Sequence, residues 1–243
     1  MDFPAKANMS NRLLSLLAPK DYDEVRARSH FVELPRNTVL AETGKPIDTV
    51  YFLAAGIGSV IVTTQEGDRA EAGIFGMDGY VPTSAVAGVE TSSYEVIMQV
   101  GGHGYALGYS DFRALMEESR SFSRIMIRAI EAFSVQLAST AVTNALHEIT
   151  QRLARWLLMC DDRISGQDIA LTHEFLSVML AVRRPSVTTS LHVLEGMGLI
   201  RSLRGSIIIR DRSGLERYAG GAYGWAEKEY QRLMLDAEAV VAG

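Results

Sequence analysis

The sequence has one cysteine among its 243 residues, and this scarcity excludes several kinds of protein. Cys160 has no second cysteine with which to form an intramolecular disulfide, so the chain lacks the pattern of a small secreted domain. A four-cysteine zinc site and a four-cysteine iron–sulfur cluster are excluded for the same reason. We predict that Cys160 is a buried thiol on an amphipathic helix and not a nucleophile.

Long apolar runs are missing from the start of the chain. The first thirty residues carry charges throughout, and no stretch among them is apolar enough for a signal peptide or a membrane span. We therefore expect a cytoplasmic protein with no membrane partner. The length, with 47% hydrophobic residues, suits one large globular domain or two small ones.

Complete motifs of the common enzyme classes are also absent. The His-Glu pairs at His147 and His173 lack the second histidine one turn later that a zinc protease needs. Gly102-His103-Gly104 lacks the last glycine of a dinucleotide-binding motif, and we predict that it forms a hairpin turn. No phosphate loop or nucleophile elbow is present. We expect no metal site, no catalytic residue and no enzymatic activity.

Basic residues are absent from one segment and concentrated in another. Between Ala70 and Phe112 there is no lysine or arginine, although acidic residues occur. Between Arg183 and Arg212 six arginines stand against two acidic residues, a net charge of +4 in a chain whose total is −5. The basic segment favours contact with nucleic acid, and the acidic one is poorly suited to bind a phosphate.

From Phe31 to about Leu107, short β-like runs alternate with glycines, which is typical of an all-β barrel or sandwich. We interpret Gly56 and Gly101-Gly102 as turns between such runs. Together with one or two short helices before it, this segment predicts a sensor domain over residues 1–110. Its expected fold is a double-stranded β-helix, that is, a jelly-roll-like barrel.

Residues 111–147 lack glycine, and apolar residues recur there at helical spacing. A continuous helix of this length would measure roughly 55 Å at ~1.5 Å per residue, longer than a small domain is wide. We predict a dimerisation helix that pairs with a second copy of the chain, and the alternative is a helix hairpin within one chain. The predicted dimer interface consists of Met126, Ile130, Phe133, Leu137 and Ala141.

The last hundred residues predict a winged helix-turn-helix domain over 148–215 and a tail helix over 216–243. Thr172 can cap a first helix, and Ala181 can occupy a tight turn after it. Pro185 suits the first turn of a second helix, Arg184–Glu195. A strand pair follows, and a polar turn is expected at residues 162–168. The whole chain is therefore expected to be of the α+β class.

The second helix has an apolar inner face and a polar, basic outer face. Arginine can fork onto guanine in the major groove, and serine and threonine can reach phosphates or base edges. The alternative is a solvated helix face with no ligand. The predicted DNA-binding residues are Thr172, Arg183, Arg184, Ser186, Thr188, Thr189, Arg201 and Arg204.

The stretch LTHEFLSVMLAVRRPSVTTSLHVLEGMGLIRSLRGSIIIRD resembles the DNA-binding domain of the catabolite activator and fumarate–nitrate regulator (Crp/Fnr) superfamily. PRNTVLAETGKPIDTVYFLAAGIGSVIV resembles that superfamily's cyclic-nucleotide-binding-type barrel, and the resemblance covers about Phe31 to Leu215. It implies a homodimeric regulator of transcription that binds an inverted repeat in double-stranded DNA, with RNA polymerase as a partner if it activates. Arg184 matches the family arginine of the recognition helix. Pro185 and Thr189 replace family residues, so the preferred DNA sequence should differ.

The sensor end departs from the family pattern. Cyclic-nucleotide binders of the family use a Gly-Glu pair for the ribose and an arginine for the cyclic phosphate. Asp78 can be aligned with the acidic residue, but no arginine follows it before Phe112. We therefore expect no cyclic AMP binding and no cofactor, and the effector is unknown. A haem on His103 has no support beyond the lone histidine.

A second class of function is a cyclic-nucleotide-type signalling or scaffold module whose winged helix binds protein. Such a winged helix would present an apolar or acidic outer face, so Arg183, Arg184, Arg201 and Arg204 favour DNA. The sequence leaves open whether the protein activates or represses, which promoter it binds, and what the tail helix does.

Overall fold

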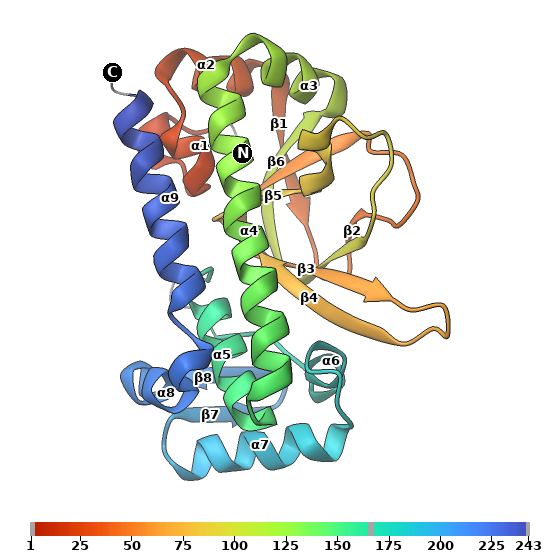
Figure 1. Ribbon diagram of the computed structural model, residues 1–243, viewed down its shortest axis with the longest axis vertical. Coiled ribbons are helices and arrows are strands. Elements are labelled where there is room, and N and C mark those ends of the chain that lie inside the picture. The colour runs from red at the N-terminus through yellow and green to blue at the C-terminus, as the bar shows by residue number, and fades with distance from the viewer. Residues whose placement is uncertain (1–2, 165–167, 242–243) are drawn as a thin grey trace.

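The computed structural model describes residues 3–164 and 168–241, and it consists of two lobes joined by one long helix (Figure 1). Residues 1–2, 165–167 and 242–243 lie outside the described residues. They fall in the predicted sensor domain, the predicted polar turn and the predicted tail. The combination of an antiparallel sheet domain, a long helix and a helix-turn-helix confirms the α+β fold class.

Short helices precede the sheet: η1 (Lys6–Asn8), α1 (Arg12–Leu16) and α2 (Pro19–Arg28). Asn11 caps α1, because its side-chain oxygen accepts a hydrogen bond from the backbone N–H of Leu14. Its amide nitrogen donates to the carbonyl oxygens of Leu53 and Gly79, at 2.8 and 2.9 Å. One buried side chain thus starts the helix and ties it to the sheet.

The sheet of the N-terminal lobe is antiparallel, in the order β1-β6-β3-β4, with β2 paired to β6 and β5 paired to β3. A short helix, η2 (Thr83–Ala87), lies between β5 and β6. The strands are β1 (Ser29–Leu34), β2 (Val39–Ala41), β3 (Thr49–Thr63), β4 (Arg69–Phe75), β5 (Tyr80–Val81) and β6 (Glu95–Gly108).

The central strands β3 and β6 are longer than the sequence predicted, since each joins two runs that we expected to be separate. Gly56 lies inside β3, with a φ of +86°, where the register to β6 shifts. Gly102 and Gly104 lie inside β6, so the predicted hairpin turn at this point is wrong. These glycines mark bulges and close backbone contacts and not turns. A Cβ atom at Gly102 would stand 2.1 Å from the carbonyl oxygen of Ala55.

The predicted continuous helix over residues 111–147 is two helices, α3 (Tyr109–Glu118) and α4 (Arg120–Leu146). Ser119 breaks them, with φ −121° and ψ 113°, and its hydroxyl accepts a hydrogen bond from the N–H of Phe122 at 3.1 Å. The serine thereby caps α4 while it ends α3. Within the described residues, α4 is the one helix long and apolar enough to cross a membrane, a property that core helices of soluble proteins share.

The predicted dimer interface is wrong at Met126 and Phe133, because both side chains are buried in their own chain. Met126 belongs to the core that α4 forms with the N-terminal helices and the sheet, and Phe133 stacks on Phe75 of β4 with ring centroids 4.2 Å apart. Ile130 and Leu137 are half-buried against the same cores. Ala141 is exposed.

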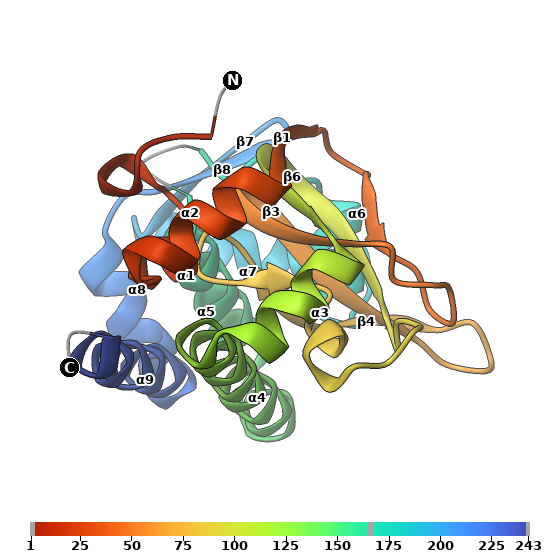
Figure 2. The same cartoon turned by 90° about the horizontal axis from the view of Figure 1, so that it is seen from above.

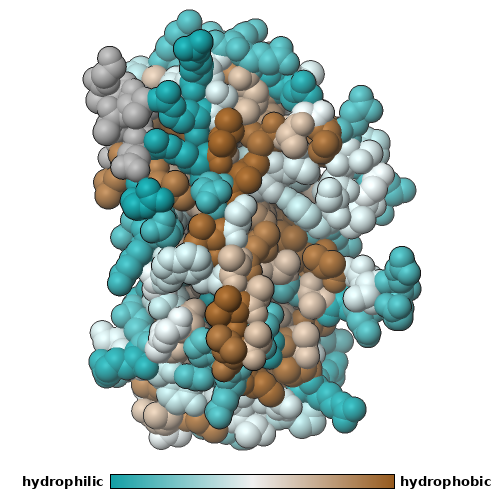
Figure 3. Space-filling model, in the orientation of Figure 1, coloured by the Kyte–Doolittle hydropathy of each residue, from teal (hydrophilic) through white to brown (hydrophobic). Residues whose placement is uncertain are grey.

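A different face of α4 is exposed and apolar. Hydrophobic surface runs down the middle of the molecule in Figure 3, in the region where α4 lies in Figure 1. Ile127, Val142 and Leu146 are 54%, 53% and 77% exposed. The exposed positions of this face, which we call the α4 outer face, are Ile127, Glu131, Ser134, Ala138, Ala141, Val142, Ala145 and Leu146.

The tail forms α9 (Trp225–Val241), which lies alongside α4 (Figures 1 and 2). Leu233 and Met234 are buried in the core that also contains Met126, and Arg128 donates to the carbonyl oxygen of Leu233 at 3.1 Å. The alternative of packing within one chain therefore holds for one side of α4. The residues of the α4 outer face remain exposed.

The C-terminal lobe is built around α5, which begins with a capping box between Glu148 and Gln151. The apolar side chains of α5 form one core with the helix-turn-helix and the strand pair. Cys160 is buried in that core, as predicted. The elements are α5 (Ile149–Asp161), α6 (His173–Met179), α7 (Arg184–Gly196), β7 (Ile200–Leu203), β8 (Ser206–Ile209), α8 (Arg212–Ala219) and η3 (Gly220–Ala222).

We expect Gly102→Ala to lower the free energy of unfolding by ~1–3 kcal/mol, because the added Cβ meets rigid backbone of β3. Gly196→Ala is the matched control, since a Cβ at that position has no atom within 4 Å. Urea unfolding of both variants measures the difference. A Gly102→Ala protein as stable as the Gly196→Ala protein would contradict the assignment of a close strand contact.

Candidate nucleic-acid interface

The first helix of the pair, α6, begins where the sequence predicted. The Thr172 hydroxyl accepts a hydrogen bond from the N–H of Phe175 at 3.3 Å, so it is the N-cap. The inner residues of α6 and its C-cap are buried in the core of the lobe. They are Phe175, Leu176, Met179 and, at the C-cap, Leu180.

The turn between the two helices depends on Ala181. This residue has a φ of +49°, in the left-handed region that non-glycine residues rarely adopt. Its N–H donates to the carbonyl oxygen of Val178, and the next residue, Val182, donates back to Ser177. The turn therefore tolerates a methyl group at a position where glycine would be less strained.

Helix α7 begins at the basic pair. Arg183 is the N-cap, Arg184 is the first helical residue and Pro185 lies in the first turn. Figure 1 shows α7 at the end of the molecule farthest from α2 and α3, with β7 and β8 beside it. The N-terminus of α7 thus carries two arginines at an outer end of the protein.

The inner face of α7 fixes its orientation. Val187, Leu191 and Leu194 are buried, as the spacing predicted. Ser190 is buried too, and its hydroxyl shares a 3.0 Å hydrogen bond with that of Thr150 on α5. These contacts direct the predicted binding residues to the opposite face.

On that face Arg183, Arg184 and Thr189 are exposed, and Ser186 and Thr188 are half-exposed. Arg184 forms an ion pair with Glu174 of α6, at 2.9 Å, and its side chain is 62% exposed. The pairing with Glu174 could not be predicted from the sequence, because it depends on how α6 crosses α7. Exposed pairs of this kind contribute only ~0.2–1 kcal/mol, so the pair can exchange for another partner.

Two threonines of α7 use their hydroxyl protons within the helix. The hydroxyl of Thr188 donates to the carbonyl oxygen of Arg184 at 3.2 Å, and that of Thr189 donates to Pro185 at 3.0 Å. The hydroxyl oxygen of Thr189, which is exposed, can still accept a hydrogen bond, for example from N4 of cytosine or N6 of adenine.

The wing consists of β7 and β8, which pair from Ile200 and Ile209 to Leu203 and Ser206. Arg201 and Arg204 are exposed, with Arg204 in the turn between the strands. A hydrogen bond from the segment before α6 holds this turn, because the N–H of Leu171 donates to the carbonyl oxygen of Gly205 at 2.9 Å. The four predicted arginines are all exposed on the C-terminal lobe.

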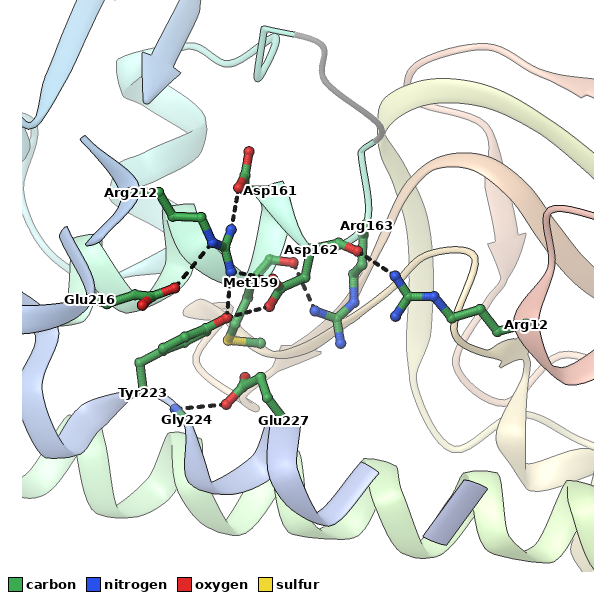
Figure 4. A network of polar contacts seen from close by, with 10 residues as sticks. All are labelled: Arg12, Met159, Asp161, Asp162, Arg163, Arg212, Glu216, Tyr223, Gly224 and Glu227. Atoms are coloured by element: carbon green, nitrogen blue, oxygen red, sulfur yellow. Dashed lines mark hydrogen bonds and ion pairs between the residues drawn. The ribbon is translucent and has the colours of Figure 1, made fainter. Parts of the chain in front are cut away.

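A buried ion pair joins the two lobes. Arg163, just after α5, contacts Asp78 of the N-terminal lobe at 2.6 Å and 3.1 Å, and the two side chains are 8% and 11% exposed. Arg12 of α1 donates to the backbone carbonyl of Asp162 at 2.9 Å (Figure 4). The acidic residue that could be aligned with the ribose contact is therefore occupied by an internal arginine.

Glu71 of β4 makes a second contact between the lobes. The indole N–H of Trp156 on α5 donates to the Oε1 atom of Glu71 at 2.8 Å, and both residues are buried. Burial raises the pKa of Glu71 from its ordinary value of 4.5 to about 8, although the hydrogen bond from Trp156 opposes the rise. The carboxyl group is therefore protonated in the folded protein at neutral pH.

Within residues 3–164 and 168–241, no group of three or more His, Cys, Asp or Glu side chains is arranged to hold a metal ion.

Two family models match the chain. The model of the cyclic nucleotide-binding domain matches residues 31–119, and the model of the Crp-like helix-turn-helix domain matches residues 151–218. The segment after residue 218, with α9, lies beyond both. A search of curated proteins found no match.

Solved structures share the fold of the chain. A CRP-family transcriptional regulator from Thermus thermophilus is 20% identical, with a TM-score of 0.65 over 79% of this chain and 98% of its own. FixK2 from Bradyrhizobium japonicum is 14% identical, with a TM-score of 0.65 over 80% and 99%. The c-di-GMP-responsive global regulator CLP of Xanthomonas campestris is 20% identical, with a TM-score of 0.57 over 78% and 98%.

Glu71 predicts a pH dependence of stability. Between about pH 5 and pH 8 the folded chain keeps a proton on Glu71 that the unfolded chain releases, so stability falls as the pH rises. Over this range we expect the wild type to lose ~1–3 kcal/mol relative to Glu71→Gln, whose amide accepts the same indole hydrogen bond without titrating. Urea unfolding at several pH values measures the difference. Glu66→Gln, at an exposed position, should follow the wild type, and a Glu71→Gln protein that also follows it would contradict the prediction.

Proposed function

The chain belongs to the Crp/Fnr family of transcriptional regulators, and on that basis we propose that it is a homodimer that binds an inverted repeat in double-stranded DNA. The observation that carries the proposal is the position of α7, whose basic N-terminus lies at an exposed end of the molecule. An exposed basic face also argues against a winged helix that binds protein. A regulator of this kind would act in the cytoplasm and would need no catalytic residue.

Arg184 is the proposed reader of the DNA sequence. The N-terminal residues of a recognition helix contact base edges in the major groove, and a guanidinium can fork onto O6 and N7 of guanine. On DNA, Arg184 would exchange Glu174 for a guanine, while Glu174 would be repelled by the phosphates. Ser186, Thr188 and Thr189 would contact adjacent base edges or phosphates.

Phosphate contacts are proposed for the residues around the reader. Arg183 lies at the N-cap of α7, and the wing carries Arg201 and Arg204. The hydroxyl of Thr172, which accepts from the N–H of Phe175, can still donate its proton to a phosphate oxygen. These contacts would position the protein without reading sequence.

The α4 outer face is the proposed dimer interface. Its small residues, Ser134, Ala138, Ala141 and Ala145, allow two helices to approach closely, and Ile127, Val142 and Leu146 would bury apolar surface at its ends. This assignment keeps Ala141 from the sequence analysis and replaces Met126 and Phe133. Two copies joined in this way would place their recognition helices on half-sites about one helical turn, ~34 Å, apart.

The effector domain is proposed not to bind cyclic AMP. Asp78 is bound by Arg163, and no lysine or arginine between Ala70 and Phe112 is available for a cyclic phosphate. This proposal is independent of whether the regulator represses transcription or activates it with RNA polymerase as a partner.

Arg184→Ala should weaken binding to the selected DNA site by ~1–3 kcal/mol and relax the choice at one base pair in each half-site. Arg204→Ala should instead weaken binding to all sequences alike and lower the salt slope by about one unit, because it removes a phosphate contact. A site selected from random oligonucleotides and a one-base variant of it, compared by fluorescence anisotropy, separate the two effects. An Arg184→Ala protein that discriminates these DNAs as the wild type does would overturn the assignment of the reader.

Val142→Glu should convert the dimer to monomers at micromolar concentration, because it places a charge in the proposed α4 interface. Val62→Glu is the matched control: Val142 and Val62 are 53% and 50% exposed, and Val62 lies near the end of β3. Light scattering on the two variants and the wild type gives the masses. A dimeric Val142→Glu protein, or a monomeric wild type that does not dimerise on DNA, would contradict the proposed interface.

Calorimetric titration with cyclic AMP should show no micromolar binding, since the segment from Ala70 to Phe112, where the family's phosphate-binding arginine would lie, contains no lysine or arginine. Micromolar affinity would mean that backbone N–H groups replace the arginine.

A further inference from the structure

A cavity of about 580 Å³ lies between the sheet, α4 and α9. Its size is within the ~300–1,000 Å³ of small-molecule sites. Several walls come from parts of the chain outside both matched segments: Arg12 and Leu16 from α1, and Ala226, Tyr230 and Met234 from α9. The cavity is therefore a feature of the additional helices of this chain as much as of its effector domain.

Part of the lining of the cavity is apolar. It includes Ile74 and Phe75 of β4, Ala132 and Phe133 of α4, and Met234 of α9. Leu235, which also lines it, is 64% exposed, so apolar surface continues from the cavity to the outside. An exposed apolar rim beside an apolar cavity suits a ligand with an apolar body.

The lining also contains three arginines, and two of them have their N–H groups engaged. Arg163 binds Asp78 through two nitrogens and donates a third N–H to the carbonyl oxygen of Met159. Arg212 contacts Asp161, Asp162 and Glu216 and also donates to the hydroxyl of Tyr223 (Figure 4). Neither arginine needs a ligand to balance its charge.

Arg12 is different. Within the described part of the chain its hydrogen bond goes to the backbone carbonyl of Asp162, and no carboxylate lies within ion-pair distance. Another carboxylate in the lining, Glu227, caps its own helix by accepting the N–H of Gly224 at 2.8 Å. The cavity thus combines an apolar lining with the guanidinium of Arg12, which has more N–H donors than its one hydrogen bond to Asp162 uses.

We propose that this cavity binds a small organic carboxylate with an apolar body, and that Arg12 holds the carboxylate. A guanidinium matches a carboxylate with two parallel N–H donors, and the apolar part of the lining takes the hydrocarbon. The site goes beyond the proposed DNA binding and does not require it. Because Asp162 and Arg163 line the same cavity, the ligand would contact the point where the lobes meet, and it would favour the lobe arrangement that fits it better.

Calorimetry on the full chain, without DNA, tests the site with octanoate as the probe and octan-1-ol as its uncharged counterpart. We expect octanoate to bind at least tenfold more tightly than octan-1-ol. Arg12→Gln should remove this preference by weakening octanoate about tenfold and leaving octan-1-ol unchanged. Arg26→Gln, an exposed arginine on α2, is the matched control and should bind both probes as the wild type does.

Ala132→Leu tests the apolar part of the lining, because the larger side chain projects into the cavity. It should weaken octanoate and octan-1-ol alike, by tenfold or more, while a thermal melt confirms that the variant is folded. Equal affinity for the two probes, or an Arg12→Gln protein that binds octanoate as the Arg26→Gln protein does, would overturn the proposal. Since no DNA is present, these outcomes are independent of whether the chain recognises an inverted repeat.

Discussion

The buried ion pair between Arg163 and Asp78 holds the two lobes together, beside the hydrogen bond from Trp156 to Glu71. Removal of one partner from such a pair costs ~3–5 kcal/mol, because the other is left charged and desolvated. The pair holds the end of α5 against the loop before β5, and α5 in turn orients α7. It also occupies the one acidic side chain that could be aligned with the ribose contact of a cyclic-nucleotide binder. The same interaction thus joins the lobes and removes a ligand site.

The sequence predicted local features well where one strong signal determines them. Thr172 and Pro185 mark the beginnings of two helices, and the apolar spacing of Val187, Leu191 and Leu194 identifies the inner face of α7. The role of glycine in the sheet could not be predicted, because Gly102 fits a turn as well as a close contact between strands, and only the register distinguishes the two. The helix break at Ser119 was not predictable, because its one signal in the sequence is the serine itself.

Contacts across the lobes could not be predicted, because they depend on the packing of distant segments. The apolar stripe of α4 was recognised, but an apolar stripe fits the core of its own chain as well as a partner. Met126 and Phe133 pack inward, and half of the positions on the α4 outer face are small residues, which give little hydrophobic signal. The contacts of Glu71 with Trp156 and of Arg184 with Glu174 likewise cannot be predicted from the order of residues along the chain.

The ion pair between Arg184 and Glu174 has a consequence for how such a protein would search a genome. While Arg183, Arg201 and Arg204 held the backbone of non-specific DNA, the reader arginine could stay folded against Glu174, outside the groove. Leaving this pair costs ~0.2–1 kcal/mol, less than the ~1–3 kcal/mol that a guanine in the right place returns. Sliding and reading would then be two states of one side chain. The protein could move quickly along unrelated sequence and stop where the exchange is favourable.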